Sequence, residues 1–348
     1  MGQFKLERVL RKNVKTLTPY ASARDEFKDF DTNMVFLDAN ESPYENGTNR
    51  YPDPHQNKLK TSIAKQKGIR EEQILLGNGS DEVLDLIFRV FCEPNQDNII
   101  SLPPTYGMYK VLAGVNTVEN REVWLDLDFQ PDVPAVLQQV DANTKLIFIC
   151  SPNNPTGNTM NRPLLEEVLN QFPGVVVIDE AYVDFSEAPT WLAVLDRFPN
   201  LIVTQTLSKA YGMAGIRLGM CFADKKIIDI LKKVKPPYNV NQLTQNQALH
   251  GISNQERILT HVQEILSERK KLSLALQELS FVQQCFPSDA NFILVRVDDA
   301  DLRYKQLLDK GIVVRNRSTQ PLCENTLRFT VGTPQENEIV VQALAKLE

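Results

Sequence analysis

The chain has 348 residues and a formal net charge of −6, which comes from 38 Lys and Arg and 44 Asp and Glu. This length exceeds what one hydrophobic core usually supports, and a hydrophobic content of 42% is typical of a folded globular chain, so we expect two packed domains. The acidic balance argues against a nucleic-acid-binding protein, because contact with phosphate backbones normally requires a basic surface.

The sequence lacks the usual signals of membrane insertion and of metal binding. No apolar run approaches the roughly 18 residues of a membrane span, and the basic N-terminus leads into no apolar signal-peptide core. The five cysteines are widely separated, and none has the spacing of a metal ligand. We therefore expect a cytoplasmic protein with reduced cysteines, no metal, and no membrane or nucleic-acid partner.

Short apolar runs rich in β-branched residues recur through the first two thirds of the chain and predict buried strands. These runs are Ile74–Gly77, Asn98–Leu102, Lys145–Cys150, Val175–Glu180, Leu201–Leu207 and Arg217–Ala223. Helix-length segments with apolar residues three and four positions apart lie between them, such as Glu82–Phe91 and Pro163–Phe172. This alternation predicts an α/β domain built on a mostly parallel sheet.

After about Leu243 the pattern changes and predicts a smaller α+β unit. A long charged helix is expected over Gln255–Leu279, and another helix is expected between the first two of three apolar runs. The runs are Asn291–Val297, Ile312–Arg315 and Thr326–Gly332. We expect residues 41–243 to form the large domain, and residues 1–40 and 244–348 to form an N-terminal segment with the small domain.

Two segments near the first predicted strands offer an anion site and an aromatic face. Gly77–Glu82 links a strand to a helix, and the free N–H groups of the first helical turn attract anions. The segment matches neither the P-loop nor the nicotinamide fingerprint, and Ser80 or Asp81 could equally act as a simple helix cap. Tyr106 follows the next strand and could stack on a flat ring, although an isolated tyrosine there more often serves packing.

An amide follows the third predicted strand, and the fourth ends in two acids, Asp179 and Glu180, that are followed by a tyrosine. Asn154 lies in a turn rich in proline, which either is a plain tight turn or presents the amide to a bound ring. Asp179 ends a buried strand, where it can cap the next element or hold a protonated ring nitrogen. Tyr182, three residues later, can reach a neighbouring phenolic oxygen.

Lys209 follows the fifth predicted strand, among hydroxyl groups and small residues. A lysine forms Schiff bases with carbonyl compounds when its surroundings favour the neutral amine, and the nearby cation Arg217 acts in that direction. An isolated lysine would be read as a solvated surface residue. Parallel strands, however, would bring Ser80, Tyr106, Asn154, Asp179 and Lys209 to one edge of the sheet, and pyridoxal phosphate is the cofactor that needs this set.

These segments resemble the aspartate aminotransferase-like, fold type I pyridoxal-phosphate enzymes, and among them the histidinol-phosphate aminotransferase family. The resemblance covers nearly the whole chain. It rests on the motifs Leu17–Arg24, Leu37–Glu41, Arg50–Asp53, Gly77–Glu82, Ser151–Gly157, Asp179–Tyr182, Ser208–Arg217, Pro236–Asn241, Gly311–Arg315 and Leu327–Gly332. It implies an α/β fold with a large domain on a mostly parallel seven-stranded sheet, and a homodimer with shared active sites.

The resemblance also implies roles for individual residues. Lys209 would hold pyridoxal 5'-phosphate as an imine and act as the catalytic base, with Asp179 on the ring nitrogen. The remaining cofactor-binding residues would be Ser80, Asp81, Tyr106, Asn154, Tyr182, Ser208, Arg217 and, from the partner subunit, Tyr51. The substrate-binding residues would be Tyr20, Asn40, Asn239, Arg315 and Arg328. Arg315 with Arg317 could instead be an ordinary solvated charge pair.

The implied reaction is transamination between L-histidinol phosphate and 2-oxoglutarate, which gives imidazole acetol phosphate and glutamate in histidine biosynthesis. Two other enzymes on the same scaffold, an aromatic amino-acid aminotransferase and a threonine-phosphate decarboxylase, remain alternatives at this stage. A regulator that senses the cofactor without catalysis is a further alternative, but it would need a DNA-binding module for which the acidic chain has no room. A degenerate homologue without activity would not be expected to retain Lys209, Asp179, Asn154 and Arg217.

Overall fold

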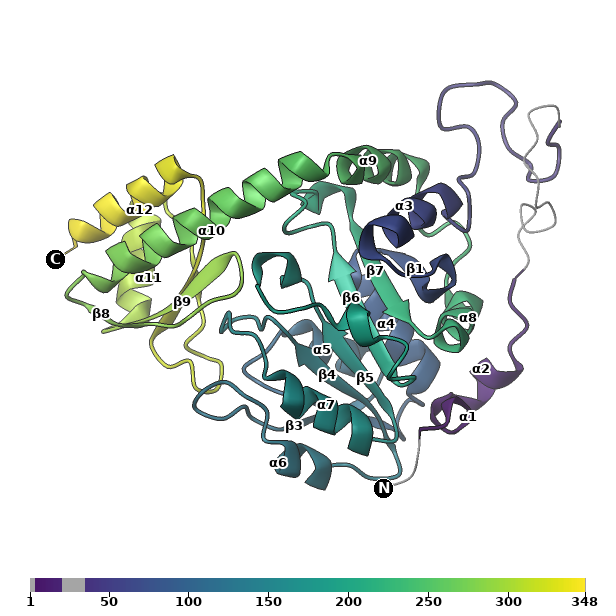
Figure 1. Ribbon diagram of the computed structural model, residues 1–348, viewed down its shortest axis with the longest axis horizontal. Coiled ribbons are helices and arrows are strands. Elements are labelled where there is room, and N and C mark those ends of the chain that lie inside the picture. The colour runs from purple at the N-terminus through teal and green to yellow at the C-terminus, as the bar shows by residue number, and fades with distance from the viewer. Residues whose placement is uncertain (1–3, 21–34, 348) are drawn as a thin grey trace.

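Two β-sheets organise residues 4–20 and 35–347, the part of the chain that the computed structural model describes (Figure 1). The larger sheet has the strand order β1-β7-β6-β5-β4-β2-β3, and the smaller has the order β10-β11-β9-β8. The long helix α10 (Gln255–Gln277) runs from beside the large sheet to the small one (Figure 1). Residues 21–24 of the first motif lie outside the described residues.

The predicted runs of the large sheet all form strands, each with one end shifted by one residue. The strands are β1 (Ile74–Asn78), β2 (Asn98–Ser101), β3 (Glu119–Glu122), β4 (Thr144–Cys150), β5 (Val175–Asp179), β6 (Leu201–Thr206) and β7 (Leu218–Ala223). The sequence gives no apolar signal for β3, because its four residues are polar or charged and it pairs only with β2 at the edge of the sheet. The mostly parallel seven-stranded sheet is therefore confirmed.

Strand β7 runs antiparallel to both of its neighbours, β1 and β6, whereas the other neighbouring strands of the large sheet are parallel. Two successive reversals leave β1 pointing in the same direction as β6. The carboxyl ends of β1, β2, β4, β5 and β6 consequently meet at one edge of the sheet. The residue that precedes β7, Arg217, reaches this same edge from the opposite direction.

Helices cover both faces of the large sheet. Alternate strand residues enter opposite cores: Val176 and Ile178 belong to one, and Val175 and Val177 belong to the other. The helices outside the small unit are α1 (Leu6–Val9), α2 (Lys12–Thr16), α3 (Asn57–Lys67), α4 (Ser80–Phe91), α5 (Met108–Val115), α6 (Val133–Gln138), α7 (Arg162–Gln171), α8 (Lys225–Val234) and α9 (Gln242–Ser253). Helices α4, α5 and α8 contribute to the core that contains Val175 and Val177.

The small sheet departs from expectation at two places, apart from the ends of the other two runs, where Asn291, Val331 and Gly332 lie outside the strands. Its elements are β8 (Val282–Cys285), β9 (Phe292–Val297), α11 (Ala300–Asp309), β10 (Arg315–Asn316), β11 (Thr326–Thr330) and α12 (Pro334–Ala345). The expected strand over Ile312–Arg315 is wrong for its first three residues, because only Arg315 joins β10 while Val314 packs into the small core without a strand partner. Strand β8, which is half exposed, carries no apolar run and was not predicted.

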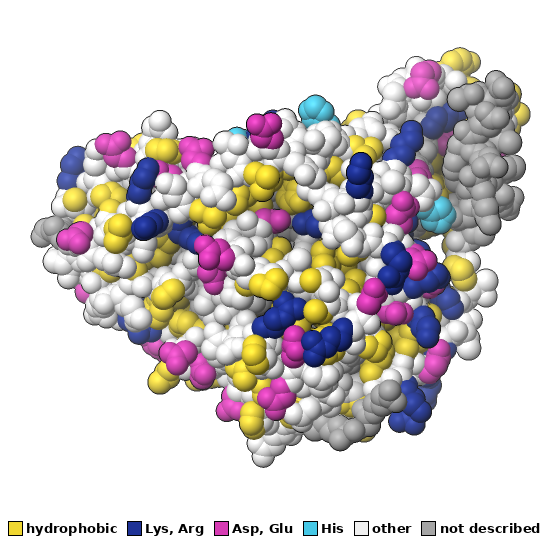
Figure 2. All heavy atoms as spheres, in the orientation of Figure 1, with side chains coloured by type: hydrophobic (Ala, Val, Ile, Leu, Met, Phe, Trp, Pro, Cys, Tyr) yellow, Lys and Arg dark blue, Asp and Glu magenta, His cyan; other side chains and the backbone are white. Residues whose placement is uncertain are grey.

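The surface in Figure 2 shows acidic and basic side chains interspersed over the visible face, without one dominant basic area. Within residues 4–20 and 35–347, no helix is long and apolar enough to cross a membrane. The division of the chain into residues 41–243 and the two flanking segments stays a prediction.

Candidate active site

One pocket brings together the predicted cofactor residues, apart from Tyr51. It lies at the edge where β4, β5 and β6 end. Its lining consists of Ser80, Asp81, Tyr106, Cys150, Asn154, Asp179, Ala181, Tyr182, Thr206, Ser208, Lys209 and Arg217. Residues that are up to 137 positions apart in the sequence, from Ser80 to Arg217, therefore share one site.

Asp179 is buried at the end of β5, with an exposed fraction of 3%. The Tyr109 hydroxyl donates to its Oδ2 at 2.9 Å, and the Thr204 hydroxyl donates to its Oδ1 at 3.1 Å. The Ala181 backbone N–H also donates to Oδ1, at 3.2 Å. Burial raises the pKa of Asp179, while these hydrogen bonds oppose the rise because they stabilise the carboxylate. None of these three hydrogen-bond partners is a cation, so the carboxylate can still form an ion pair with a protonated ring nitrogen.

Lys209 follows β6 in a tight turn, in which the Gly212 N–H donates to the Lys209 carbonyl at 3.0 Å. Loss of solvation lowers the pKa of its ammonium group, and the guanidinium groups of Arg328 and Arg217 lower it further. The carboxylate of Asp179 acts in the opposite direction. The Lys209 Nζ lies 5.7 Å from the centre of the Tyr182 ring. This environment increases the fraction of neutral amine, as the sequence analysis predicted.

The N-terminus of α4 and the residue before β7 form a cradle beside the lysine. A Cβ on Gly79, which has φ +84°, would lie 2.6 Å from Arg217 Nη2, and one on Gly219 would lie 2.3 Å from the Ser80 backbone nitrogen. Both glycines are needed for this close approach. The first backbone N–H groups of α4 have no acceptor within the helix and attract anions. The guanidinium of Arg217 lies 3.5 Å from Asp81 Oδ2 and adds positive charge at the same point.

Tyr106 stands at the same end of the pocket. Its hydroxyl donates to Asp81 Oδ1 at 3.1 Å, and its ring meets the Tyr109 ring edge-on at a centroid distance of 5.6 Å. Burial and the Asp81 carboxylate raise the pKa of Tyr106, so the phenol stays neutral near neutral pH. A neutral, half-buried ring held at its tip in this way suits a stacking partner for a planar ligand.

Asn154 links the pocket to the small sheet. The Arg328 guanidinium on β11 donates through Nη1 to Asn154 Oδ1, which leaves the amide nitrogen as the end that can donate to a ligand oxygen. The Arg328 guanidinium also lies 5.0 Å from the Phe292 ring centre, and Phe292 meets Tyr182 edge-on at 5.1 Å. The two sheets thus meet at the pocket through the contacts Arg328–Asn154 and Phe292–Tyr182.

Arg328 belongs to a group of arginines on and beside β10 and β11. Arg315 and Arg328 are directly opposed across these antiparallel strands. The Nε atoms of Arg317 and Arg328 are buried and have no hydrogen-bond partner within the described residues. Burial and the neighbouring arginines lower the pKa of both groups. Like charges on opposed strands repel each other, and an anion bound among these arginines would relieve that repulsion.

The other predicted residues lie outside the Lys209 pocket of a single chain. Tyr20 lines a separate hollow with lysines of α8, and Asn40 and Tyr51 line another one beside Asn241. Tyr51 stacks on Tyr238 at 4.4 Å and remains about half exposed.

Asn239 is likewise held outside the Lys209 pocket. Its Nδ2 donates to the Leu76 carbonyl at 3.1 Å and to Glu82 Oε2 at 2.8 Å. Its Oδ1 accepts a hydrogen bond from Lys235 Nζ at 2.9 Å. These bonds engage both ends of the amide with the protein itself.

Tyr109, Thr204 and Cys150 were not among the site residues predicted from the sequence. Tyr109 and Thr204 bond to Asp179, and Cys150 lines the pocket. Two of the three lie within predicted apolar strands, where a polar side chain gives no sign of which face it occupies. Only the position of Tyr109, three residues after Tyr106 and near the start of a helix, could have indicated that it belongs to the site.

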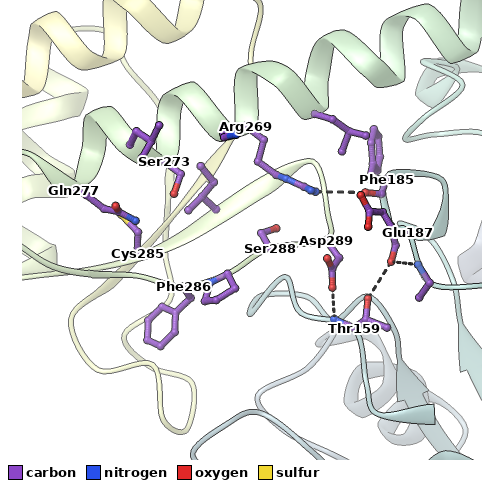
Figure 3. Close-up of a pocket in the computed structure, with 17 residues that line it drawn as sticks. Thr159, Phe185, Glu187, Arg269, Ser273, Gln277, Cys285, Phe286, Ser288 and Asp289 are labelled. Carbon is purple, nitrogen blue, oxygen red and sulfur yellow. Dashed lines mark hydrogen bonds between the residues drawn. The ribbon is translucent and has the colours of Figure 1, made fainter.

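A larger cavity lies elsewhere, between α10, the segment around Phe286 and the loop after Phe185 (Figure 3). Arg269, Glu187 and Asp289 give it charges of both signs, and Asp289 accepts a hydrogen bond from the Thr159 backbone N–H at 2.9 Å. None of the predicted site residues lines this cavity. The chemistry-bearing residues thus converge on the Lys209 pocket rather than on this larger cavity.

The chain is similar to known aminotransferases over nearly its whole length. The family described as "Aminotransferase class I and II" matches residues 26–344. A histidinol-phosphate aminotransferase of Flavobacterium johnsoniae is 59% identical over 348 residues, which cover 100% of both chains. One of Parabacteroides distasonis is 53% identical over 343 residues, with 99% of both chains covered.

Solved structures show the same fold. The histidinol-phosphate aminotransferase of Clostridium acetobutylicum aligns with a TM-score of 0.79 and 25% identity, over 86% of this chain and 90% of the other. The Sinorhizobium meliloti protein of that name, in complex with pyridoxal-5'-phosphate, has a TM-score of 0.79 at 22% identity, over 86% and 84%. The expected fold type I architecture is confirmed.

Proposed function

The chain belongs to the histidinol-phosphate aminotransferase family, within the class I and II aminotransferases, and on this premise we propose how its residues carry out the reaction. The reaction is the transfer of an amino group between L-histidinol phosphate and 2-oxoglutarate, which gives imidazole acetol phosphate and glutamate. The observation that carries the residue assignment is the convergence of Lys209, Asp179 and Asn154 with the cradle at Gly79 in one pocket.

The residues in the pocket fit pyridoxal 5'-phosphate. When bound, this cofactor supplies a carbonyl group that condenses with amines and a protonated ring that withdraws electrons. Its phosphate would be held by Ser80, the Asp81 backbone, Ser208 and Arg217, which the absence of side chains at Gly79 and Gly219 allows to lie close together. Tyr106 would stack on the ring.

Lys209 would serve as both anchor and base. Its lowered pKa favours the neutral amine, which is the form that bonds to a carbonyl carbon. With the substrate amine bound in its place, the same Nζ would take the proton from the substrate carbon that bears the nitrogen and would deliver that proton to a carbon of the cofactor. The guanidinium groups of Arg328 and Arg217 would favour the neutral amine at this position.

Asp179 and Asn154 would set the electronic state of the bound ring. The buried carboxylate would keep the ring nitrogen protonated through a charge-assisted hydrogen bond. The amide nitrogen of Asn154 and the hydroxyl of Tyr182 would both approach the ring oxygen. Because Arg328 holds the other end of the Asn154 amide, the orientation of that donor depends on the substrate-binding side of the pocket.

Arg328 and its neighbours would bind the substrate anions. The two substrates differ in the anionic group that these arginines would bind. Histidinol phosphate presents a phosphate, and 2-oxoglutarate presents carboxylates. A guanidinium binds both kinds of group through paired hydrogen bonds. The unpartnered Nε atoms of Arg317 and Arg328 support this assignment, because a bound anion would supply the missing acceptor. Arg315, Tyr20, Asn40 and Asn239 would complete the substrate site.

The proposal also covers the quaternary state, the domain boundaries and the location of the enzyme. Tyr51 lies outside the pocket of its own chain, and we propose that it reaches the cofactor phosphate of a partner subunit in a homodimer. We also propose that residues 41–243 form the cofactor-binding domain, that residues 1–40 and 244–348 form the N-terminal segment and small domain, and that the enzyme acts in the cytoplasm.

An absorbance experiment tests the proposal. The purified protein is loaded with pyridoxal phosphate, and its spectrum is recorded before and after addition of L-histidinol phosphate without an oxo acid. Conversion of the cofactor band, followed by its recovery with 2-oxoglutarate, is the expected result. Phosphothreonine and phenylalanine are the comparison substrates, and faster conversion by either would contradict the substrate assignment. The absence of any cofactor band would contradict the role of Lys209.

A further inference from the structure

Tyr109 is a completely buried tyrosine at the second position of α5, and no part of the reaction described above uses it. Its ring stacks on Phe148 at 4.9 Å and meets the edge of Tyr106 at 5.6 Å. Packing on two sides fixes the ring, and with it the position of the hydroxyl. That hydroxyl donates to Asp179 Oδ2 at 2.9 Å.

The Asp179 carboxylate depends on such donors because it is buried without a cation in contact. Its hydrogen-bond partners within the described residues are the hydroxyls of Tyr109 and Thr204 and the backbone of Ala181. Burial alone would favour the neutral acid. Of the interactions that oppose burial, the hydrogen bond from Tyr109 is the largest. A protonated Asp179 could not form an ion pair with a ring nitrogen.

Whether Asp179 is ionised or neutral depends mainly on its uncharged hydrogen-bond donors, because most of the titratable groups around it are themselves neutral. They are Asp81, Tyr106, Tyr109, Cys150, Tyr182 and Lys209. Burial raises the pKa values of the three tyrosines and the cysteine, so these four groups are neutral near neutral pH. Asp81 disfavours a second carboxylate nearby, while the Lys209 cation favours one. Neither of these two groups bonds directly to Asp179.

We propose that Tyr109 is a positioning residue whose hydroxyl keeps the Asp179 carboxylate ionised and oriented in the apoenzyme, ready to pair with the ring nitrogen of the incoming cofactor. This inference rests on the proposed role of Asp179. Removal of the hydroxyl leaves the ring packing in place but takes one donor from a buried carboxylate. The acid then takes up a proton at a higher pH, and cofactor binding weakens on the acidic side.

The test measures the affinity of the full-length apoenzyme for pyridoxal phosphate as a function of pH, by absorbance titration. In wild type the affinity falls as the pH decreases, and the Asp179→Asn variant identifies the part of this fall that belongs to Asp179. In Tyr109→Phe we expect that part to move to higher pH by about one unit, which corresponds to roughly tenfold weaker binding below the transition. At higher pH the two affinities should converge.

Three further variants separate the hydrogen bond from packing. Tyr106→Phe removes a hydroxyl that bonds to Asp81 instead, and Phe148→Leu disturbs the stacked ring without removing a donor. Tyr106→Phe should not move the Asp179 transition, and Phe148→Leu should move it less than Tyr109→Phe does, because the donor remains. Thr204→Val removes the donor to the other carboxylate oxygen and should move the transition in the same direction as Tyr109→Phe. An equal shift in Phe148→Leu, or no shift in Tyr109→Phe, would overturn the proposal.

The outcomes also distinguish this inference from the proposed function. If wild type does not bind pyridoxal phosphate, or if Asp179→Asn leaves its pH dependence unchanged, the role assigned to Asp179 is wrong and the inference about Tyr109 is wrong with it. If Asp179→Asn removes the dependence while Tyr109→Phe matches wild type, Asp179 keeps its role and only the role of Tyr109 is lost.

Discussion

Arg328 on β11 donates a hydrogen bond to the side-chain oxygen of Asn154, in the loop that follows β4. One residue belongs to the small sheet and the other lines the Lys209 pocket at the edge of the large sheet. The bond therefore joins the proposed substrate-binding and ring-binding groups. If Arg328 binds the substrate anion as proposed, occupation of that site and orientation of the Asn154 amide would be coupled through a single guanidinium.

Replacement of Arg328 by alanine should weaken both half-reactions. The variant loses an anion-binding guanidinium and releases Asn154, and each hydrogen bond to a charged group is worth about 1.5–3 kcal/mol. We expect kcat/KM for histidinol phosphate and for 2-oxoglutarate to fall by about 10- to 100-fold, measured in separate half-reactions. Arg197→Ala, which removes an exposed arginine paired with Glu166, is the matched control. A loss with one substrate alone would contradict a shared anion site.

Replacement of Lys209 by alanine should abolish turnover. General base catalysis alone contributes about 10²- to 10⁴-fold, and the variant also loses the covalent anchor of the cofactor. The expected result is no detectable product with a normal far-ultraviolet circular dichroism spectrum. Lys110→Ala, at an exposed lysine paired with Glu122, should keep wild-type activity. Near-normal turnover in a well-folded Lys209→Ala protein would show that another residue is the base.

The ionisation of Lys209 should respond to the charge of Arg328. Desolvation and Arg328 lower the pKa of Lys209 in the folded protein, so its neutral form appears at a lower pH than for a free lysine. Arg328→Gln removes one cation, and the midpoint should move to higher pH. The rate of acylation of Lys209 in the apoenzyme, followed by peptide mass spectrometry across pH, measures that midpoint. An unchanged or lower midpoint in Arg328→Gln would contradict the proposed electrostatic coupling.

The close approach of β7 to the start of α4 should make Gly219 sensitive to substitution. A Cβ there would lie 2.3 Å from the Ser80 backbone nitrogen, so backbone must move. We expect Gly219→Ala to lower the free energy of unfolding by about 1–3 kcal/mol and to weaken pyridoxal phosphate binding. Gly114→Ala, within α5 and with open space around its Cα, should be neutral or slightly stabilising. Chemical denaturation and cofactor titration measure the two effects, and equal behaviour of both variants would refute the steric argument.

A shared active site should be detectable by mixing two inactive proteins. Lys209→Ala lacks the base, and Tyr51→Ala lacks the tyrosine proposed to serve the partner's site. In a mixed dimer one site carries both changes and the other carries neither, so random exchange should restore about a quarter of wild-type activity. The measurement is the activity of the mixture after unfolding and refolding together. Activity no greater than the average of the separate variants would contradict the contribution of Tyr51 across subunits.

Local sequence was sufficient to predict most of the large sheet and the cluster at its edge. Short apolar runs identified six strands. The carboxyl ends of five of them, with the segments that follow, supplied Ser80, Tyr106, Asn154, Asp179 and Lys209. Their convergence was predictable because parallel strands end at the same edge. The polar strand β3 and the two-residue strand β10 left no such pattern, since an edge or very short strand gains little from apolar residues.

The tertiary structure alone decided which polar groups meet. The antiparallel direction of β7 carries Arg217 to the pocket, and the pairing of β10 with β11 sets Arg315 opposite Arg328. The bond from Tyr109 to Asp179 spans 70 positions and leaves no periodic trace in the sequence. Periodicity records whether a side chain is buried, because burial repeats with the geometry of the element. The partner of a buried polar group depends on the packing of distant elements, which local periodicity does not encode.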